Sequence, residues 1–193
     1  TISNIHIMPN APEVGETVAC MYDYTDVDGD PDQSSISWEI AGVNFPSMPG
    51  QTLEIPEGIT ASTLITCSVD PFDGEDSGMI GQISDWIANS LPYVLGFSLS
   101  QTYDPAGDIE FDCFYDMFDD NGDSLSYTLE WYVNGNLKLS TPNPEWEDRM
   151  VMNYDLDIDH GQNADVYCKI TNLDDGYMNS LSFTSNTVTT EWQ

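Results

Sequence analysis

The chain has 193 residues, with 34 Asp and Glu against 3 Lys and Arg, which gives a formal net charge of -31. This charge excludes nucleic acids as partners, because clustered cationic side chains are what holds a phosphate backbone, and it equally excludes anionic membrane surfaces. Hydrophobic residues still make up 40% of the chain and aromatic residues 11%, so we expect a packed core rather than disorder. No uncharged apolar run is long enough to cross a bilayer, and we therefore expect no membrane insertion.

Short segments of alternating apolar and polar residues run through the whole chain. This period of two is typical of β-strands that are buried on one face. In the first half the segments are 4–8, 17–22, 35–40 and 64–69, and in the second half 108–115, 126–133, 165–171 and 182–189. Clusters of Gly, Pro, Asn and Asp separate them, and no window shows a convincing helical spacing. The pattern predicts an all-β chain that forms β-sandwiches.

The two halves of the sequence are copies of one unit, which becomes visible when Cys20 is aligned with Cys113. The second copy then repeats the first copy's aromatic, acidic and glycine positions, and it becomes longer only beyond Gly135. The sequence therefore predicts two homologous domains, 1–90 and 91–193, with the boundary at the short polar linker before Pro92. The matching residues are Cys20, Tyr22, Asp23, Asp26, Asp28, Gly29, Asp30, Trp38 and Gly42 with Cys113, Tyr115, Asp116, Asp119, Asn121, Gly122, Asp123, Trp131 and Gly135.

Four cysteines allow three pairings, and the repeat favours Cys20 with Cys67 and Cys113 with Cys168. A tryptophan, Trp38 or Trp131, follows the first cysteine of each pair at the same distance. This spacing suits an immunoglobulin-like sandwich, in which a disulfide joins the two sheets and a core tryptophan packs on it. We therefore expect two tandem immunoglobulin-like β-sandwich domains, each with one inter-sheet disulfide, in an oxidising extracellular compartment. The alternative is four buried free thiols in a cytosolic protein.

One feature departs from antibody-type domains. Those domains carry a tyrosine two residues before the second cysteine, whereas this chain has Ile65 and Val166 there.

Acidic loops follow the predicted strands 17–22 and 108–115, and a further acidic turn follows the second cysteine of each copy. In an immunoglobulin-like sandwich these two loops lie at the same end. Calcium is bound by six to eight oxygen ligands, and closely spaced carboxylates repel one another without a cation. We therefore expect calcium as a cofactor. The candidate ligands are Asp26, Asp28, Asp30, Asp70 and Asp73 in the first copy, and Asp119, Asn121, Asp123, Asp174 and Asp175 in the second.

These loops match neither an EF-hand nor a zinc site, and the calcium interpretation has one alternative. The loops are not EF-hands, because Pro31 and Ser124 occupy the position at which that motif needs glycine. Zinc is not expected, since the two histidines, His6 and His160, fall in different domains. The alternative is that the Asp and Gly residues form solvated turns without a metal.

These features together resemble the tandem immunoglobulin-like repeats related to the PKD and cadherin-like domains of secreted bacterial and archaeal surface proteins. The resemblance covers nearly the whole chain and departs from the usual pattern at Ala41-Gly42 and at Asn121. It implies an extracellular, calcium-rigidified spacer or adhesive module and implies no activity. The shared motifs are the first strand ending at Pro9, the D-x-D-G-D loop at 26–30, the aromatic run ending in Asn-Gly at 131–135, the Asp73-Gly74 turn, and the Asn-Ser-Leu-Pro exit at 89–92.

We therefore expect a non-enzymatic structural protein of the cell surface. Strand-like segments at both ends, 1–8 and 182–192, favour self-association into a head-to-tail fibre or layer, or pairing with neighbouring surface-protein domains. The alternative is that these segments are the ordinary first and last strands of their own domains. The acidity suits either a calcium-rich exterior or a protein hydrated in high salt.

The alternative is a ligand- or carbohydrate-binding adhesin that uses Trp86, Trp146 and Trp192. An enzyme is not expected, because the common nucleophile, metalloprotease and phosphate-loop motifs are missing. A pair of carboxylates at glycosidase spacing arises by chance among 34 acidic residues.

Overall fold

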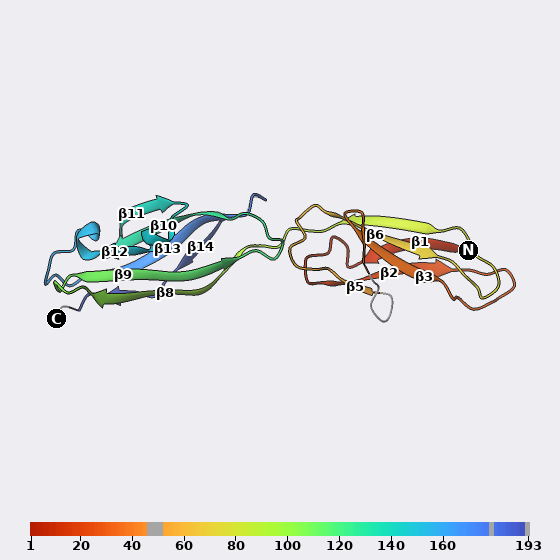
Figure 1. Ribbon diagram of the computed structural model, residues 1–193, viewed down its shortest axis with the longest axis horizontal. Helices are drawn as coiled ribbons and strands as arrows, with labels where there is room; N and C mark the ends of the chain where they lie inside the picture. Colours follow the sequence, from red (N-terminus) through yellow and green to blue (C-terminus); the bar gives the residue numbers. More distant parts are fainter. Residues whose placement is uncertain (46–51, 178–179, 192–193) are drawn as a thin grey trace. The chain divides into compact units, whose positions relative to one another are not determined.

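The computed structural model describes residues 1–45, 52–177 and 180–191, which form an all-β fold (Figure 1). The chain divides into two compact units. The first consists of Thr1–Ser90 with Asp120–Gly122, and the second of Leu91–Asp119 with Asp123–Gln193. The main division therefore lies where the sequence analysis placed the domain boundary, and the three residues 120–122 are the exception.

The first unit contains two antiparallel sheets. One has the order β1-β2-β5 and the other the order β4-β3-β6-β7. The strands are β1 (Ile2–Met8), β2 (Thr17–Tyr24), β3 (Ser35–Ile40), β4 (Val43–Phe45), β5 (Thr52–Glu54), β6 (Leu64–Asp70) and β7 (Gly81–Trp86).

The second unit has the same strand order, with β8-β9-β12 in one sheet and β11-β10-β13-β14 in the other, where β15 also pairs with β13. Its strands are β8 (Tyr93–Tyr103), β9 (Ile109–Phe118), β10 (Ser126–Val133), β11 (Asn136–Pro142), β12 (Met150–Met152), β13 (Asp165–Asp174), β14 (Leu181–Thr184) and β15 (Val188–Thr189). Two short 3-10 helices, η1 (Trp146–Arg149) and η2 (Asn153–Leu156), flank β12. They accommodate part of the additional length of the second copy.

The two units agree in strand register as well as in strand order. Val18 on β2 pairs with Leu53 on β5, and its counterpart Phe111 on β9 pairs with Val151 on β12. The repeat seen in the sequence is therefore a repeat of side-chain positions in the sheets.

Disulfides Cys20–Cys67 and Cys113–Cys168 connect the two sheets of each unit. The first joins β2 to β6 across a Cα–Cα distance of 6.2 Å, and the second joins β9 to β13 across 6.4 Å. All four cysteines are thus paired, in the combination that the repeat favours. Trp38 and Trp131 lie in the cores of the two units and are 0% exposed.

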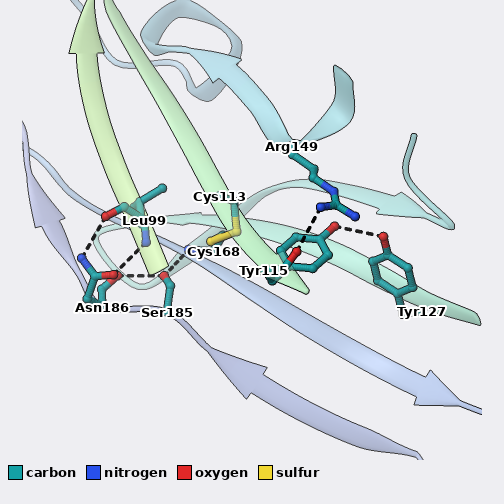
Figure 2. Close-up of a disulfide and its surroundings, with 8 residues drawn as sticks. All are labelled: Leu99, Cys113, Tyr115, Tyr127, Arg149, Cys168, Ser185 and Asn186. Carbon is teal, nitrogen blue, oxygen red and sulfur yellow. Dashed lines mark hydrogen bonds between the residues drawn. A yellow bond between two sulfur atoms is a disulfide. The ribbon is translucent and has the colours of Figure 1, made fainter. Parts of the chain in front are cut away.

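The last predicted strand, 182–189, is interrupted in the structure, because β14 ends at Thr184 and β15 begins at Val188. Between them, the Asn186 side chain accepts a hydrogen bond from the Leu99 backbone N–H at 2.7 Å and donates one to the Leu99 carbonyl at 3.0 Å (Figure 2). The Ser185 hydroxyl accepts a hydrogen bond from the Cys168 backbone N–H at 3.0 Å. Asn186 therefore connects this edge of the five-stranded sheet to β8 in the other sheet.

The strands near both ends of the chain pair within their own units. β1 pairs with β2, and β15 pairs with β13, so both are ordinary members of their sheets. Of the segment expected to associate head to tail, Trp192 lies outside the described residues. No helix in the described part of the chain is long and apolar enough to span a membrane.

Candidate metal centre

In both units the loop after β2 or β9 carries an aspartate that closes the loop on itself. In the first unit, Asp26 Oδ1 accepts hydrogen bonds from the backbone N–H groups of Asp28, Gly29 and Asp30 at 2.8, 2.9 and 3.2 Å. The bonds from Asp30 and Asp28, followed by that from Gly29, hold the pKa of Asp26 below its ordinary value. Asp26 is therefore ionised at neutral pH. The side chains of Asp28 and Asp30 are exposed.

The acidic turn after β6 faces this loop. Asp73 Oδ1 accepts hydrogen bonds from the backbone N–H groups of Glu75 and Asp76 at 2.8 and 2.6 Å, and these bonds lower the Asp73 pKa. The negative charge of Asp26 acts in the opposite direction and raises the Asp73 pKa. Asp26, Asp73 and Asp76 line one pocket of about 90 Å³.

Two residues change the predicted ligand set of the first unit. Asp70 is an exposed residue at the end of β6, opposite Ser35, and it does not line this pocket. Asp76 lines the pocket although the sequence analysis did not select it. The structure therefore brings together Asp26 and Asp73 from the predicted set, and adds Asp76 beside them.

The second unit repeats the arrangement in a more buried form. Asp119 Oδ1 accepts a hydrogen bond from the Asp123 backbone N–H at 3.1 Å, as Asp26 does from Asp30. In the following turn, Asp175 is only 5% exposed, and its Oδ1 accepts a hydrogen bond from the Tyr177 N–H at 2.8 Å. Asp174 Oδ1 accepts one from the Gly176 N–H at 2.6 Å and closes the same turn.

Two carboxylate oxygens in this cluster are buried without a hydrogen bond. Within the described residues, Asp119 Oδ2 and Asp123 Oδ2 have no hydrogen-bond partner. Burial, followed by the charges of Asp119 and Asp175, raises the pKa of Asp123. Burying a charged oxygen without a partner costs free energy unless a proton or a cation compensates it. Asp119, Asp123 and Asp175 are therefore the strongest candidates for holding a cation.

The Asn121 side chain makes its hydrogen bonds to backbone groups outside this cluster. It is 0% exposed, and it belongs to the segment Asp120–Gly122 that groups with the first unit. Its Oδ1 accepts a hydrogen bond from the Ser90 N–H at 2.6 Å, and its Nδ2 donates to the Ile59 carbonyl at 2.9 Å. The side chain predicted as a calcium ligand is thus engaged with backbone groups.

The carboxylates are not already arranged around a point at coordination distance. In the described ranges, no group of three His, Cys, Asp or Glu side chains has the spacing of a metal site. Calcium–oxygen distances are about 2.3–2.6 Å, so a bound ion requires the loops to draw closer together. The acidic side chains of these loops therefore do not form a preassembled metal site in the described residues.

The exposed tryptophans of the alternative prediction lie apart from the acidic loops in sequence. Trp86 ends β7 and is 59% exposed, and Trp146 begins η1 and is 65% exposed. Trp146 lies beside the Arg149 guanidinium, whose Cζ is 5.1 Å from the indole ring. Neither tryptophan lines the pocket at Asp26 and Asp73, nor the pockets at Tyr132 and at Ile2 elsewhere in the described residues.

Neither a protein-family model nor a curated protein sequence matches this chain.

Proposed function

We propose that this chain is a non-enzymatic, extracellular structural module made of two immunoglobulin-like sandwiches whose acidic loops bind calcium. The strand order supports the fold assignment. In each unit a three-stranded sheet is joined to a larger sheet, of four strands in the first unit and five in the second, by a disulfide between inner strands, β2 and β6 or β9 and β13. A buried tryptophan lies on the strand next to the second cysteine, as it does in immunoglobulin domains.

The two disulfides support an oxidising location. Such bonds persist in secreted and surface-exposed proteins and are rare in the reducing cytosol. In small domains each such bond typically stabilises the fold by about 2–4 kcal/mol. This is the basis for proposing a place at the cell surface.

The observation that carries the calcium proposal is the pair of buried, unpartnered oxygens, Asp119 Oδ2 and Asp123 Oδ2. Calcium accepts carboxylate, carbonyl and water ligands in a flexible geometry, which suits loops that approach one another without forming a rigid site. Asp119, Asp123 and Asp175 would supply ligands in the second unit. Asp26 and Asp73, with Asp76, would do so in the more exposed pocket of the first unit, and we expect weaker binding there.

In this proposal calcium also allows copies of the chain to associate. A net charge of -31 makes two copies of the chain repel one another. Self-association into a fibre or layer, or pairing with neighbouring surface domains, therefore requires cations that neutralise part of this charge. In this proposal calcium stiffens each unit and also permits units to pack.

The test is thermal unfolding of the full chain in calcium, in chelator, and in magnesium or sodium at matched ionic strength. An ion that binds only the folded state raises the melting temperature by mass action. We expect a large shift with calcium and a small one with magnesium. Equal shifts in all salts at matched ionic strength would instead mean that the acidic loops are solvated and that the acidity is an adaptation to a saline environment.

A further inference from the structure

The outer face of the five-stranded sheet in the second unit carries a shallow pocket of about 340 Å³. Its neighbours in sequence, Trp131, Val166 and Cys168, are buried, so the alternation along β10 and β13 turns the pocket residues away from the core. Small-molecule sites begin at about 300 Å³, so the pocket has room for one small ring. The lining residues are Tyr132, Tyr167, Lys169, Thr184 and Thr187.

Lys169 is a cation without a carboxylate partner. It lies directly opposite Glu130, where a cross-strand ion pair is expected, but Glu130 Oε2 accepts a hydrogen bond from the Tyr132 hydroxyl at 2.8 Å instead. All 34 acidic residues lie in the described part of the chain, and none of their carboxylates is within 4.0 Å of the Lys169 ammonium.

The other two cations of the chain are engaged. Lys138 pairs with Asp157 at 3.2 Å, and the Arg149 guanidinium lies 4.0 Å from the centroid of the Tyr115 ring (Figure 2). In a protein with a net charge of -31, an ammonium group that has not recruited a carboxylate is available to an external anion.

The two tyrosines form a preorganised aromatic surface next to this ammonium. Tyr132 and Tyr167 face each other across β10 and β13, with ring centroids 4.9 Å apart and an angle of 3° between the ring planes. The hydrogen bond to Glu130 fixes the Tyr132 ring, so little conformational freedom is lost when a ligand packs against the pair. Thr184 pairs with Lys169 across β13 and β14, and it lines the pocket together with Thr187.

We propose that this pocket binds an acidic saccharide, a sugar unit that carries a carboxylate. The C–H face of the sugar ring packs on the tyrosine pair, and the carboxylate accepts a charge-assisted hydrogen bond from Lys169. The ring hydroxyls exchange hydrogen bonds with Thr184 and Thr187. A neutral sugar leaves the ammonium unpaired, and an extended acidic peptide lacks the ring and its hydroxyls. None of the pocket residues is a candidate calcium ligand, so this inference is independent of the calcium proposal.

Salt conditions matter for the test. The chain's net charge of -31 repels an anionic ligand at long range, whereas the contact with Lys169 is short. Because the Debye length is about 8 Å at physiological ionic strength, the repulsion is largely screened there while the local pair is retained. Binding is therefore measured at or above that ionic strength, in chelator and in calcium alike.

The experiment is an NMR titration of the ¹⁵N-labelled full chain with methyl glucuronide and methyl glucoside, which differ only at C6, where the first carries a carboxylate and the second a hydroxymethyl group. We expect the amide signals of Tyr132, Tyr167, Lys169 and Thr184 to shift, and the glucuronide to bind more tightly. Lys169→Met should weaken glucuronide binding about tenfold and leave glucoside binding unchanged. Lys138→Met, a cation change outside the pocket, should affect neither.

Thr184→Val provides a second variant at an exposed position, and it should weaken both sugars because it removes a hydroxyl rather than a charge. The proposal is overturned if these amides do not shift with millimolar glucuronide, if both sugars bind equally well, or if an acidic peptide such as oligoglutamate binds at the same residues with the same affinity.

Discussion

Trp131 lies directly opposite Cys168 on neighbouring strands, in the same register in which Trp38 lies opposite Cys67. The covalent bond between the sheets and the largest buried side chain of each unit thus share one layer of the core. Because both units have this arrangement, the disulfide and the tryptophan constitute a single packing element that the repeat has preserved through differences in loop length. The first prediction concerns this element.

Replacing Cys113 and Cys168 together with alanine should lower the free energy of unfolding of the second unit by about 2–5 kcal/mol, because the unfolded chain is no longer constrained by a closed loop. The same double change at Cys20 and Cys67 should cost a similar amount, since the loops of 47 and 55 residues differ little in closure entropy. Guanidinium unfolding of the two variants, followed by circular dichroism, measures both values. Losses below about 1 kcal/mol in both variants would contradict the prediction.

A second prediction concerns the calcium cluster. The double variant Asp119→Asn, Asp123→Asn should be more stable than the wild-type chain in chelator, because it removes charges that are buried without partners. It should gain far less from calcium, which stabilises a folded protein by about 2.7 kcal/mol at a hundredfold excess over the dissociation constant. The double variant should therefore be more stable than the wild type in chelator and less stable in calcium. If the cluster only destabilised the fold and bound no calcium, the variant would be the more stable protein in both conditions.

Asp116→Asn is the matched control for this experiment, because Asp116 is an exposed acidic residue on β9 of the same unit. It should leave the calcium-dependent shift of the melting temperature intact. If the double variant and the control respond to calcium alike, the Asp119 and Asp123 carboxylates are not ligands.

In the absence of calcium, the pKa values of Asp123 and Asp26 should be shifted in opposite directions. Burial, followed by the charges of Asp119 and Asp175, raises the pKa of Asp123. Protonation of Asp123 therefore stabilises the folded state: this contribution is fully present below the ordinary aspartate pKa of 3.8 and is lost as the pH rises through the pKa of the folded state. Backbone hydrogen bonds lower the pKa of Asp26, so its contribution is present above 3.8 and lost as the pH falls through the folded-state pKa.

Carboxyl ¹³C NMR measures this directly. The midpoint of Asp123 should lie above the ordinary aspartate value and that of Asp26 below it. Calcium should move the Asp123 midpoint downward, since a bound cation favours the ionised form. An Asp123 midpoint at or below that of Asp26 in chelator would be inconsistent with the buried cluster.

A further prediction concerns the link between Asn186 and Leu99. Asn186→Ala should destabilise the second unit by about 1–3 kcal/mol, because the Leu99 N–H and carbonyl, on a residue only 4% exposed, lose their partners. Asn163→Ala, at an exposed asparagine of the same unit, is the control and should have little effect. Hydrogen exchange at the Leu99 amide should accelerate in the Asn186 variant alone. Unchanged exchange would show that water replaces the side chain without cost.

The regular strands were predictable because they are governed by local alternation. The predicted segments 35–40 and 126–133 coincide with β3 and β10, since each has one face in a core and one face in solvent. The interruption at Asn186 was missed, although the two apolar residues of the predicted strand, Phe183 and Val188, lie five positions apart and so break the alternation. What ends β14 is the side-chain hydrogen bonding of Asn186 to a strand that is distant in sequence.

The candidate metal centre was predictable in part. The spacing of acidic residues identified the loops, but it assigned Asn121 and Asp123 equivalent roles. In the structure the Asn121 amide bonds to backbone groups, whereas Oδ2 of the Asp123 carboxylate is buried without a hydrogen-bond partner. The pocket at Tyr132, Tyr167 and Lys169 gave no signal in the sequence, because it depends on the register between β10 and β13. Register is a property of strand pairing and is not encoded in the composition of either strand alone.

The disulfides also determine how each unit responds to a pulling force. Tension that enters through β1 and leaves through β7 passes across the Cys20–Cys67 bond, so β3, β4 and β5 lie inside a covalent loop that carries no load. In the second unit the loop from Cys113 to Cys168 shelters β10, β11 and β12 in the same way. At about 3.4 Å per residue, the loops of 47 and 55 residues withhold about 160 Å and about 190 Å of chain from extension. A stretched molecule therefore lengthens only by its outer strands until a reductant opens the loops.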